Sequence, residues 1–483
     1  MGRTSAGEPK RARRFRSSVE RCAIAMEDLE HPSIVAESDG NAPAAARSLD
    51  ALRTLFAEAY LRGFSVVLWD GTLKPSFGVP AFVLRVNEPF ALRAAFSPPI
   101  DLNPGRAFAN GWIEIEGDVE AAADALMRAL GGIRGRRLAR FATTLLRLPA
   151  PPSHVENLRA AHLHGTPHSR DRDREAIAFH YDLPVEFFAS FLDPELAYSC
   201  AYFDDGIDTL ADAQRAKMDY LLRKLRVRPG ERLLDIGCGW GSLATYAAER
   251  YGARVTGITL SASQAEFARR RIAERGLTGR CEVETLDYRD LGARRFDKIV
   301  SVGMVEHVGA TNLAAYVRAA WDALEPGGLF LNHGIAEQSE GRRGGKITGF
   351  MARYVFPDGE LVAVSNVLGS AERCGFEVRD VENLREHYAR TLRIWLANLE
   401  RNRAAAVAAS DERTYRIWRL YLGGSAQGFT SGRLGLFQAL LAKPHEDGTV
   451  PLPRTRRALY TTPKRALLVR DRAASLARIG RQR

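Results

Sequence analysis

The stretch LLDIGCGWG, residues 233–241, decides the fold of this chain. Its apolar start predicts a buried strand, and Gly237, Gly239 and Gly241 then interrupt the strand before a helical pattern begins at Ser242. Because glycine has no Cβ, backbone N–H groups and a helix N-terminus can come close to a ligand at such a turn. The stretch therefore predicts a strand–turn–helix unit that binds a small molecule.

Two details argue against the nearest alternative, the dinucleotide turn of an NAD-dependent oxidoreductase. The third glycine of that fingerprint is replaced by Ser242. The next expected strand, residues 254–258, is followed by Thr259, where an NAD site usually has an acidic residue for the ribose. The pattern D-x-G-x-G-x-G, which begins at Asp235, resembles instead the S-adenosylmethionine turn of class I methyltransferases.

Strand and helix patterns alternate around this turn, which predicts a doubly wound, Rossmann-like α/β sheet. Ser261 and Gln264 have the spacing of a capping box and are expected to open a helix that reaches Arg275. We expect strands over residues 232–236, 254–258, 281–286, 298–302, 329–333 and 434–442, and helices also over residues 242–251 and 311–324.

A chain of 483 residues is long enough for roughly two or three domains. An apolar pattern with a helix around Leu52 and several short strands predicts a small α+β domain before the α/β domain. The expected parts are a disordered basic segment (1–47), the small N-terminal α+β domain (48–148), a proline- and charge-rich linker (149–174), the α/β domain (175–444) and a basic tail (445–483).

Composition favours a soluble cytoplasmic protein, with 46% apolar and 26% charged residues. There is no run of 18 apolar residues to span a membrane, and the first 30 residues have no apolar core of a secretory signal. No C-x-x-C pair occurs, so reduced thiols are expected at Cys22, Cys200, Cys238, Cys281 and Cys374.

The net charge of +11 is concentrated at the two ends of the chain. Residues 1–20 hold six Lys/Arg against two Glu, and residues 443–483 hold eleven against three Asp/Glu, which leaves residues 21–442 close to neutral. Such ends could bind an anionic membrane surface or nucleic acid, or stay solvated. Because they lack interleaved aromatic residues, we expect no nucleic-acid partner. Residues 454–483 could form a weak basic amphipathic helix, which favours peripheral membrane association.

Several spaced motifs resemble the cyclopropane-fatty-acyl-phospholipid synthase family, which includes the mycolic acid methyltransferases. The resemblance covers about residues 175–444 and extends more weakly into the N-terminal domain. The motifs are FHYDLPVEFF (179–188), YSCAYF (198–203), LLDIGCGWG (233–241), VTGITLSASQ (255–264), VSVGMVEHVG (300–309) and, more weakly, GRAFANGWIEIEGD (105–118).

The resemblance implies a class I methyltransferase fold and an enzyme that transfers a methylene from S-adenosylmethionine to the double bond of an unsaturated phospholipid acyl chain, with a homodimer as a possible assembly. Related outcomes stay open: a C-methyltransferase that makes methyl-branched or methylene-bearing chains, or an N-methyltransferase of a small amine. Ring closure and proton loss elsewhere share every step up to the cation on the acyl chain, so these residues alone do not separate them.

The resemblance also implies which residues contact the cofactor. Asp287 follows a strand at the carboxyl edge of the sheet, where ligands of open α/β folds bind, although it could be a simple turn residue. Thr259 could likewise be a helix cap. The implied cofactor residues are Tyr198, Ser199, Asp235, Gly237, Gly239, Gly241, Thr259, Gln264, Asp287 and Tyr288.

Ring closure requires a base, and the family resemblance implies that a bound bicarbonate supplies it. Donors and acceptors are both needed for this ion. Alternative roles stay open. Cys200 could be a buried apolar residue, Tyr388 could pack in the core, and His307 could act in place of Glu306. The implied bicarbonate ligands are Cys200, Glu306, His333, Tyr388 and the backbone N–H of Ile335.

Some residues depart from the family pattern or suggest other sites. Pro184-Val185 replaces a common Gly-Asn after HYDL, and the stretch from His333 reads His-Gly-Ile-Ala instead of His-Thr-Ile-Gly. Ser425 stands where some members have cysteine, so we assign no thiol chemistry there. His162, His164 and His168 have metal-ligand spacing but lie in the expected linker without a cysteine, so no metal site is expected.

Overall fold

The computed structural model describes residues 42–60, 63–152, 158–337 and 349–460. The chain divides into two compact units. Unit 1 consists of the residues through Leu158 together with residues 416–427, and unit 2 consists of the rest from Arg159 onward. The predictions for the far ends of the chain concern residues 1–41 and 461–483, which lie outside the described residues.

Unit 1 is an α+β unit with one four-stranded sheet in the order β2-β1-β3-β4. Strands β1 and β3 pair in parallel, and β4 pairs antiparallel with β3. Leu52 and Leu55 of the first helix pack with Val66 and Val86 of the sheet in a fully buried core. The elements are α2 (Ala42–Tyr60), β1 (Ser65–Leu68), β2 (Leu73–Lys74), β3 (Phe82–Val86), α3 (Ala91–Phe96), α4 (Asn103–Ala109), β4 (Ile113–Gly117), α5 (Val119–Gly132) and α6 (Gly135–Leu146).

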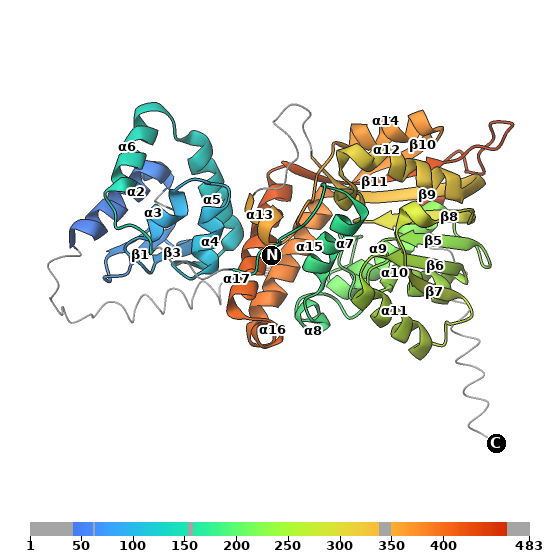
Figure 1. Cartoon of the computed structure of the whole chain (residues 1–483), viewed down its shortest axis with the longest axis horizontal. Helices are drawn as coiled ribbons and strands as arrows, with labels where there is room; N and C mark the ends of the chain where they lie inside the picture. The colour runs from blue at the N-terminus through green and yellow to red at the C-terminus, as the bar shows by residue number, and fades with distance from the viewer. Residues whose placement is uncertain (1–41, 61–62, 153–157, 338–348, 461–483) are drawn as a thin grey trace, which may run out of the picture. The chain divides into compact units, whose positions relative to one another are not determined.

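Unit 2 is built around a seven-stranded sheet in the order β10-β11-β9-β8-β5-β6-β7 (Figure 1). The pairs among β5, β6, β7, β8 and β9 are parallel, and β11 pairs antiparallel with both β9 and β10. The strands are β5 (Arg232–Ile236), β6 (Arg254–Thr259), β7 (Cys281–Thr285), β8 (Phe296–Val302), β9 (Leu324–Glu337), β10 (Glu377–Asn383) and β11 (Leu434–Ala442).

Helices cover both faces of this sheet because its strands are apolar on both sides. Leu233 packs with α9, α10 and α11 on one face, while its neighbour Leu234 packs with α12 and α14 on the other. The helices of unit 2 are α7 (Arg170–Tyr181), α8 (Val185–Ala189), α9 (Leu210–Leu225), α10 (Ser242–Tyr246) with the π-helix η1 (Ala247–Tyr251), α11 (Ala262–Glu274), the 3-10 turn η2 (Tyr288–Asp290), α12 (Val305–Ala323), α13 (Gly349–Tyr354), α14 (Val364–Cys374), α15 (Arg385–Arg401), α16 (Arg403–Ala409) and α18 (Arg457–Tyr460). Residues 416–427 of α17 (Glu412–Thr430) belong to unit 1.

The predicted fold class, a doubly wound α/β sheet, is confirmed, and β11 coincides with the strand predicted over residues 434–442. Some local predictions differ from the structure. Helix α7 begins at Arg170, inside the stretch 149–174 that composition marks as a linker. Strand β10 was not expected, because a strand that pairs on one side only can carry charges that hide its pattern.

Among the described residues, no helix combines the length and the apolar character needed to cross a membrane.

Candidate functional site

The glycine turn after β5 requires its glycines for two different reasons. Gly237, Gly239 and Gly241 all have positive φ, at 79°, 54° and 78°, a region that other residues rarely adopt. A Cβ on Gly241 would lie 2.9 Å from the Cβ of Ala268, so this glycine also allows α11 to pack closely. The N–H groups of Gly237 and Cys238 both donate to the carbonyl of Ile258, which fixes the turn to the end of β6.

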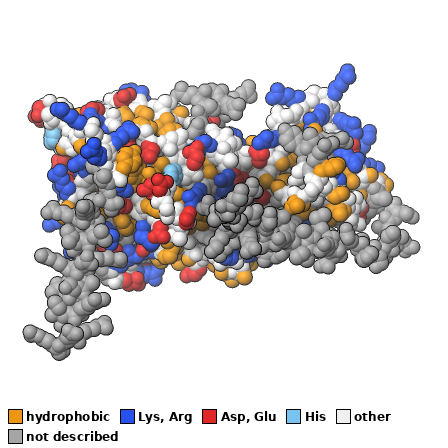
Figure 2. Space-filling view, turned by 180° about the vertical axis from the view of Figure 1, so that it is seen from behind, with side chains coloured by type: hydrophobic (Ala, Val, Ile, Leu, Met, Phe, Trp, Pro, Cys, Tyr) orange, Lys and Arg blue, Asp and Glu red, His pale blue; other side chains and the backbone are white. Residues whose placement is uncertain are grey.

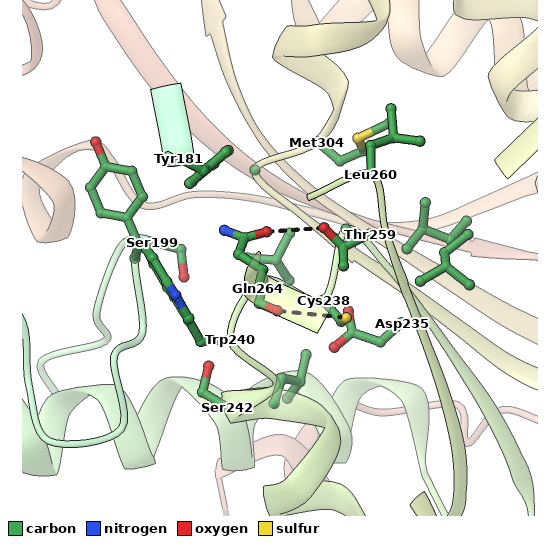
Figure 3. A pocket seen from close by; sticks show the side chains of 18 of the residues that line it. Tyr181, Ser199, Asp235, Cys238, Trp240, Ser242, Thr259, Leu260, Gln264 and Met304 are labelled. Carbon is green, nitrogen blue, oxygen red and sulfur yellow. Dashed lines mark hydrogen bonds between the residues drawn. The ribbon is translucent and has the colours of Figure 1, made fainter. Parts of the chain in front are cut away.

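A pocket opens beside this turn at the carboxyl ends of β5 and β6, with a volume of about 920 Å³ including its open mouth (Figure 3). Gly241 and Asp287 are absent from its lining. Of the predicted cofactor residues, those that line the pocket are Tyr198, Ser199, Asp235, Gly237, Gly239, Thr259, Gln264 and Tyr288.

Thr259 and Gln264 form one wall of the pocket and are bonded to each other. The Thr259 hydroxyl donates to Gln264 Oε1 at 2.9 Å and accepts from the N–H of Ser261 at 3.2 Å. Ser261 is the N-cap of α11, and its hydroxyl accepts from the Gln264 N–H at 3.3 Å. Only this half of the predicted capping box is formed, because the Gln264 side chain turns towards Thr259 instead of back to the cap.

Asp287 faces an arginine instead of the pocket. Arg289 donates to its carboxylate through Nε at 2.8 Å and through a terminal nitrogen at 2.6 Å, and the Arg289 backbone N–H adds a third bond at 2.9 Å. Burial by itself would raise the pKa of Asp287, but these bonds hold that pKa below its usual value. The alternative of a turn aspartate therefore describes Asp287 in this structure, where it caps η2.

Tyr181 of α7 and Trp240 of the glycine turn line the pocket, and Phe188 of α8 packs against both. The rings of Tyr181 and Trp240 lie edge to face at 6.0 Å, and Phe188 lies 4.7 Å from Trp240. Tyr198 stacks on Trp395 at 5.3 Å. Both Tyr181 and Trp240 lie inside motifs that the sequence analysis quoted, yet neither was singled out, because an aromatic residue in a motif also fits ordinary core packing.

Two buried ionisable side chains of opposite type line the pocket. Asp235 and Lys217 both line it, and each is about 2% exposed. Burial raises the pKa of Asp235 to about 7 and lowers the pKa of Lys217 to about 8. Lys217 was missed in the sequence, because a lysine in an amphipathic helix such as α9 normally faces solvent.

The predicted base site contains one direct contact. Glu306, on the first turn of α12, accepts a hydrogen bond from the Ile335 N–H on β9 through Oε1 at 2.7 Å. Its other oxygen, Oε2, is buried and has no hydrogen-bond partner in the described part of the chain. Burial raises the pKa of Glu306 to about 7, although the Ile335 N–H works in the opposite direction. In this structure the Ile335 N–H, which the sequence analysis gave as a bicarbonate ligand, donates to the Glu306 carboxylate.

His333 lies two residues before Ile335 on the same strand, opposite Gln438 of β11. The Gln438 amide nitrogen lies 3.2 Å from His333 Nδ1, so a Gln438 donor leaves the ring proton on Nε2. Nε2 is buried and has no partner among the described residues. Burial lowers the pKa of His333 to about 3, so the ring is neutral. A neutral histidine with a free N–H is a suitable donor to an anion.

Cys200 and Tyr388 meet at the start of α15. The Sγ of Cys200 and the N–H of Tyr388 both approach the carbonyl of Leu384, at 4.0 Å and 3.1 Å. Burial raises the pKa of the Cys200 thiol, which therefore stays protonated. Tyr388 packs its ring 4.7 Å from that of Phe429, in keeping with the alternative of core packing. Glu306 and His333 offer an acceptor and a donor without partners among the described residues, whereas the Cys200 thiol already donates to the carbonyl of Ala201 at 3.3 Å.

Two histidines that the sequence left open have different surroundings. His307 lines the pocket, and burial lowers its pKa to about 4. His168 lies 3.5 Å from Asp173 and 3.9 Å from Glu360. Its side chain fills the space beside Gly309, where a Cβ would come within 2.3 Å of it. His168 thus lies between the carboxylates of Asp173 on α7 and Glu360, and it packs against α12 at Gly309.

Comparisons with known proteins give a consistent picture. The model of the family described as mycolic acid cyclopropane synthetase matches residues 168–439. A probable fatty acid methyltransferase from Pseudomonas putida is 43% identical over 402 residues, which are 81% of this chain and 95% of that protein. The cyclopropane-fatty-acyl-phospholipid synthase of Escherichia coli K12 is 38% identical over 56% of this chain and 68% of that protein.

Solved structures are similar to the same part of the chain. A cyclopropane synthase from Mycobacterium tuberculosis superposes with a TM-score of 0.53 at 35% identity, over 56% of this chain and 98% of that one. A mycolic acid cyclopropane synthase, solved as a complex with SAH and CTAB, has the same score, identity and coverage.

Proposed function

This chain belongs to the mycolic acid cyclopropane synthetase family, whose members are S-adenosylmethionine-dependent methyltransferases, and we propose that it acts on the double bond of an unsaturated phospholipid acyl chain. The product we propose is a cyclopropane ring that contains one carbon from the cofactor. The observation that carries this proposal is the pair of buried, unpartnered polar atoms, Glu306 Oε2 and His333 Nε2, close to the end of β9.

The pocket residues fit S-adenosylmethionine. Asp235 leaves a buried carboxylate oxygen without a partner among the described residues, and the Gly237 and Gly239 turn leaves room that a side chain would fill. When bound, the cofactor supplies an electrophilic methyl group. The aromatic rings of Tyr181 and Trp240 in the pocket lining exclude water, which matters because a cation forms on the acyl chain after methyl transfer.

Ring closure removes a proton from the transferred methyl carbon, and the resulting carbon–carbon bond neutralises the cation. Glu306 and His333 hold the acceptor and the donor that fit a bicarbonate ion, which would supply the base. Because Gln438 holds His333 from behind and Ile335 holds Glu306, both side chains are fixed before the anion binds.

A second candidate is methyl transfer to the same double bond followed by proton loss elsewhere, which gives a methyl-branched or methylene-bearing chain. The similarity to a probable fatty acid methyltransferase over 81% of this chain favours it. Expression in a host that lacks cyclopropane lipids, followed by mass spectrometry of the fatty acids, tests both. A gain of one methylene unit is expected, and catalytic hydrogenation then separates ring from alkene products. An unchanged lipid profile, with methyl transfer to an amine instead, contradicts both.

A phospholipid substrate requires access to a membrane surface, and α6 of unit 1 supports peripheral association. Residues 134–147 hold five arginines and no acidic residue. On the same helix Leu138 is 45% exposed and Leu146 is 69% exposed. In Figure 2, which views the chain from behind, Lys and Arg side chains gather at the upper right, over the part of unit 1 that carries α6. A basic helix with exposed leucines is typical of an interfacial helix.

A further inference from the structure

Helix α12 is broken at Gly309, directly after the turn that carries Glu306. Gly309 has φ 74° and ψ 156°, so residues 305–308 form a turn that is separate from the rest of the helix. In a continuous helix the carbonyl of Glu306 would accept from the N–H of Ala310. The ψ angle of Gly309 sets the direction of that N–H, and 156° in place of a helical value of about −42° turns it away. Both backbone groups therefore need another partner.

Glu360 bonds to both of these groups. Its N–H donates to the carbonyl of Glu306 at 2.9 Å. Its carboxylate oxygen Oε2 accepts from the N–H of Ala310, also at 2.9 Å. The carboxylate thus lies at the start of the second part of the helix, where the helix dipole favours a negative charge. One residue outside α12 therefore replaces the helical bond with two bonds, one on each side of the break.

A histidine fills the space at the break. A Cβ on Gly309 would lie 2.3 Å from His168 Nε2, so the ring packs directly on this glycine. The same nitrogen lies 3.9 Å from the Glu360 carboxylate. Asn312, on the second part of the helix, donates to the His168 carbonyl at 3.2 Å. The break is therefore a packed feature of the fold with contacts on both of its sides.

The segment that carries Glu360 is itself held at both ends. Asp358, two residues earlier, accepts two hydrogen bonds from the guanidinium of Arg172 on α7, one of them at 2.9 Å. These two side chains are only 17% and 19% exposed. Ala363, three residues later, forms a parallel bridge with Glu337 at the end of β9. Glu360 is thus fixed relative to α7 and β9, which makes it a firm support for α12.

The two parts of α12 have different contacts with the sheet. On the second part, the buried Tyr316 hydroxyl donates to Asn332 Oδ1 of β9 at 2.9 Å, which fixes this part by itself. On the first turn, Glu306 accepts from the Ile335 N–H at 2.7 Å. Because the second part has its own place on the sheet, the bend at Gly309 sets where the Glu306 carboxylate lies.

We propose that Glu360 is a positioning residue for the base site: it holds the first turn of α12 at the angle that brings the Glu306 carboxylate to the end of β9. This inference rests on the proposed role of Glu306 in organising the base. A cap that only stabilised α12 would change the stability of the protein without a selective effect on the chemical step, and this difference can be measured.

The test compares turnover with binding in the intact chain. Turnover is measured as release of S-adenosylhomocysteine in the presence of vesicles of an unsaturated phospholipid. Glu360→Ala should lower kcat about 10- to 100-fold, because small misplacements of a reacting group have effects of this size. The KM for the lipid and the affinity for S-adenosylhomocysteine should stay within about threefold, since neither contact is removed. Wild-type kcat in Glu360→Ala overturns the proposal.

Two further variants distinguish positioning from stability. Glu360→Gln keeps an oxygen acceptor for the Ala310 N–H and should restore kcat to within about threefold of wild type. Asp118 caps α5 of unit 1 through the same kind of bond, accepting from the Ala121 N–H at 3.0 Å, so Asp118→Ala should leave kcat unchanged. No recovery in Glu360→Gln, or an equal loss of kcat in Asp118→Ala, overturns the proposal.

A double variant separates this inference from the proposed function. In a Glu306→Gln background, Glu360→Ala should lower kcat by less than about threefold more, because the charge that it positions is already gone. Losses that multiply overturn the proposal. Normal turnover in Glu306→Gln alone would instead refute the role of Glu306 in the proposed function. If Glu360→Ala does not fold, Glu360→Asp shortens the reach to Ala310 by one methylene and should lower kcat several-fold at unchanged affinities, and wild-type kcat in that variant refutes the positioning role.

Discussion

Glu306 combines burial, a single backbone hydrogen bond and an unpartnered oxygen, so its charge can be tested with little change of shape. Glu306→Gln keeps an acceptor for the Ile335 N–H and removes the negative charge. If the carboxylate organises the base, turnover should fall about 10²- to 10⁴-fold, the usual effect of losing a positioned acid or base. Affinity for S-adenosylhomocysteine should stay within a few-fold, as calorimetry can check. Near-normal turnover would mean that the carboxylate is structural.

The same residue predicts a pH dependence of stability. Burial raises the pKa of Glu306 from its ordinary value of 4.5 to about 7. Between these pH values the unfolded chain releases the proton while the folded protein keeps it, so rising pH lowers the free energy of unfolding, by roughly 3 kcal/mol at most. Asp235 also titrates near 7. Denaturant unfolding of wild type and Glu306→Gln at several pH values isolates the contribution of Glu306 to the pH dependence of the free energy of unfolding. The two proteins should differ more at pH 8 than at pH 5, and a constant difference contradicts the assignment.

At the residue scale, sequence reasoning succeeded where spacing carries the information. The three glycines after β5 are visible as a pattern, and all three adopt positive φ. Asp287 was correctly placed after a strand, but its partner Arg289 depends on how η2 turns the chain. Lys217 could not be recognised, because burial of one lysine in α9 depends on how the loop at Ser199 folds over it.

The element that covers the pocket mouth, α7, is tied to the sheet through Arg289. This arginine donates to Asp173 of α7 at 2.9 Å and to Asp287 after β7 at 2.6 Å. Arg289→Ala should loosen α7, raise amide hydrogen exchange over residues 170–181 and weaken S-adenosylhomocysteine binding several-fold. Arg294→Ala is a matched control, because Arg294 pairs with Glu284 at the surface. Unchanged exchange in α7 would show that packing alone holds the helix.

At the scale of helices and strands, the sequence predicted the elements whose residues are buried and apolar. Strands with apolar residues on both faces were found, and β11 was found to the residue. Helix α12 begins at Val305 instead of residue 311, because Gly309 interrupts its regular geometry and hides the first turn from pattern reading. The segment around Arg170 looked like a linker because α7 has many charged residues, several of which pair with neighbouring elements.

At the scale of the whole molecule, the basic C-terminal segment begins later in the structure than the sequence analysis placed it, at residue 445. Arg456 pairs with Asp380, and Arg223 donates to the carbonyl of Leu459, so residues up to Tyr460 are part of unit 2. A truncation at residue 454 would remove both contacts and therefore damage the fold. Removal of residues 461–483 leaves both contacts in place. That segment holds seven Lys/Arg and one Asp.

The proposed attachment to a membrane can be tested on two basic segments, residues 461–483 and α6. Each Lys or Arg near anionic lipid contributes about 1 kcal/mol, so either segment alone could attach the protein. We expect deletion of residues 461–483 to weaken co-sedimentation with anionic liposomes, and Arg136→Gln combined with Leu146→Gln to weaken it further. Met127→Gln on α5, 43% exposed, is the matched surface control. Binding should fade as salt shortens the Debye length towards about 3 Å at 1 M and should be absent on zwitterionic vesicles. Full binding after both changes would exclude these segments as the anchor and leave other surfaces, such as the exposed loop residues Phe77 and Val79, to contact the lipid.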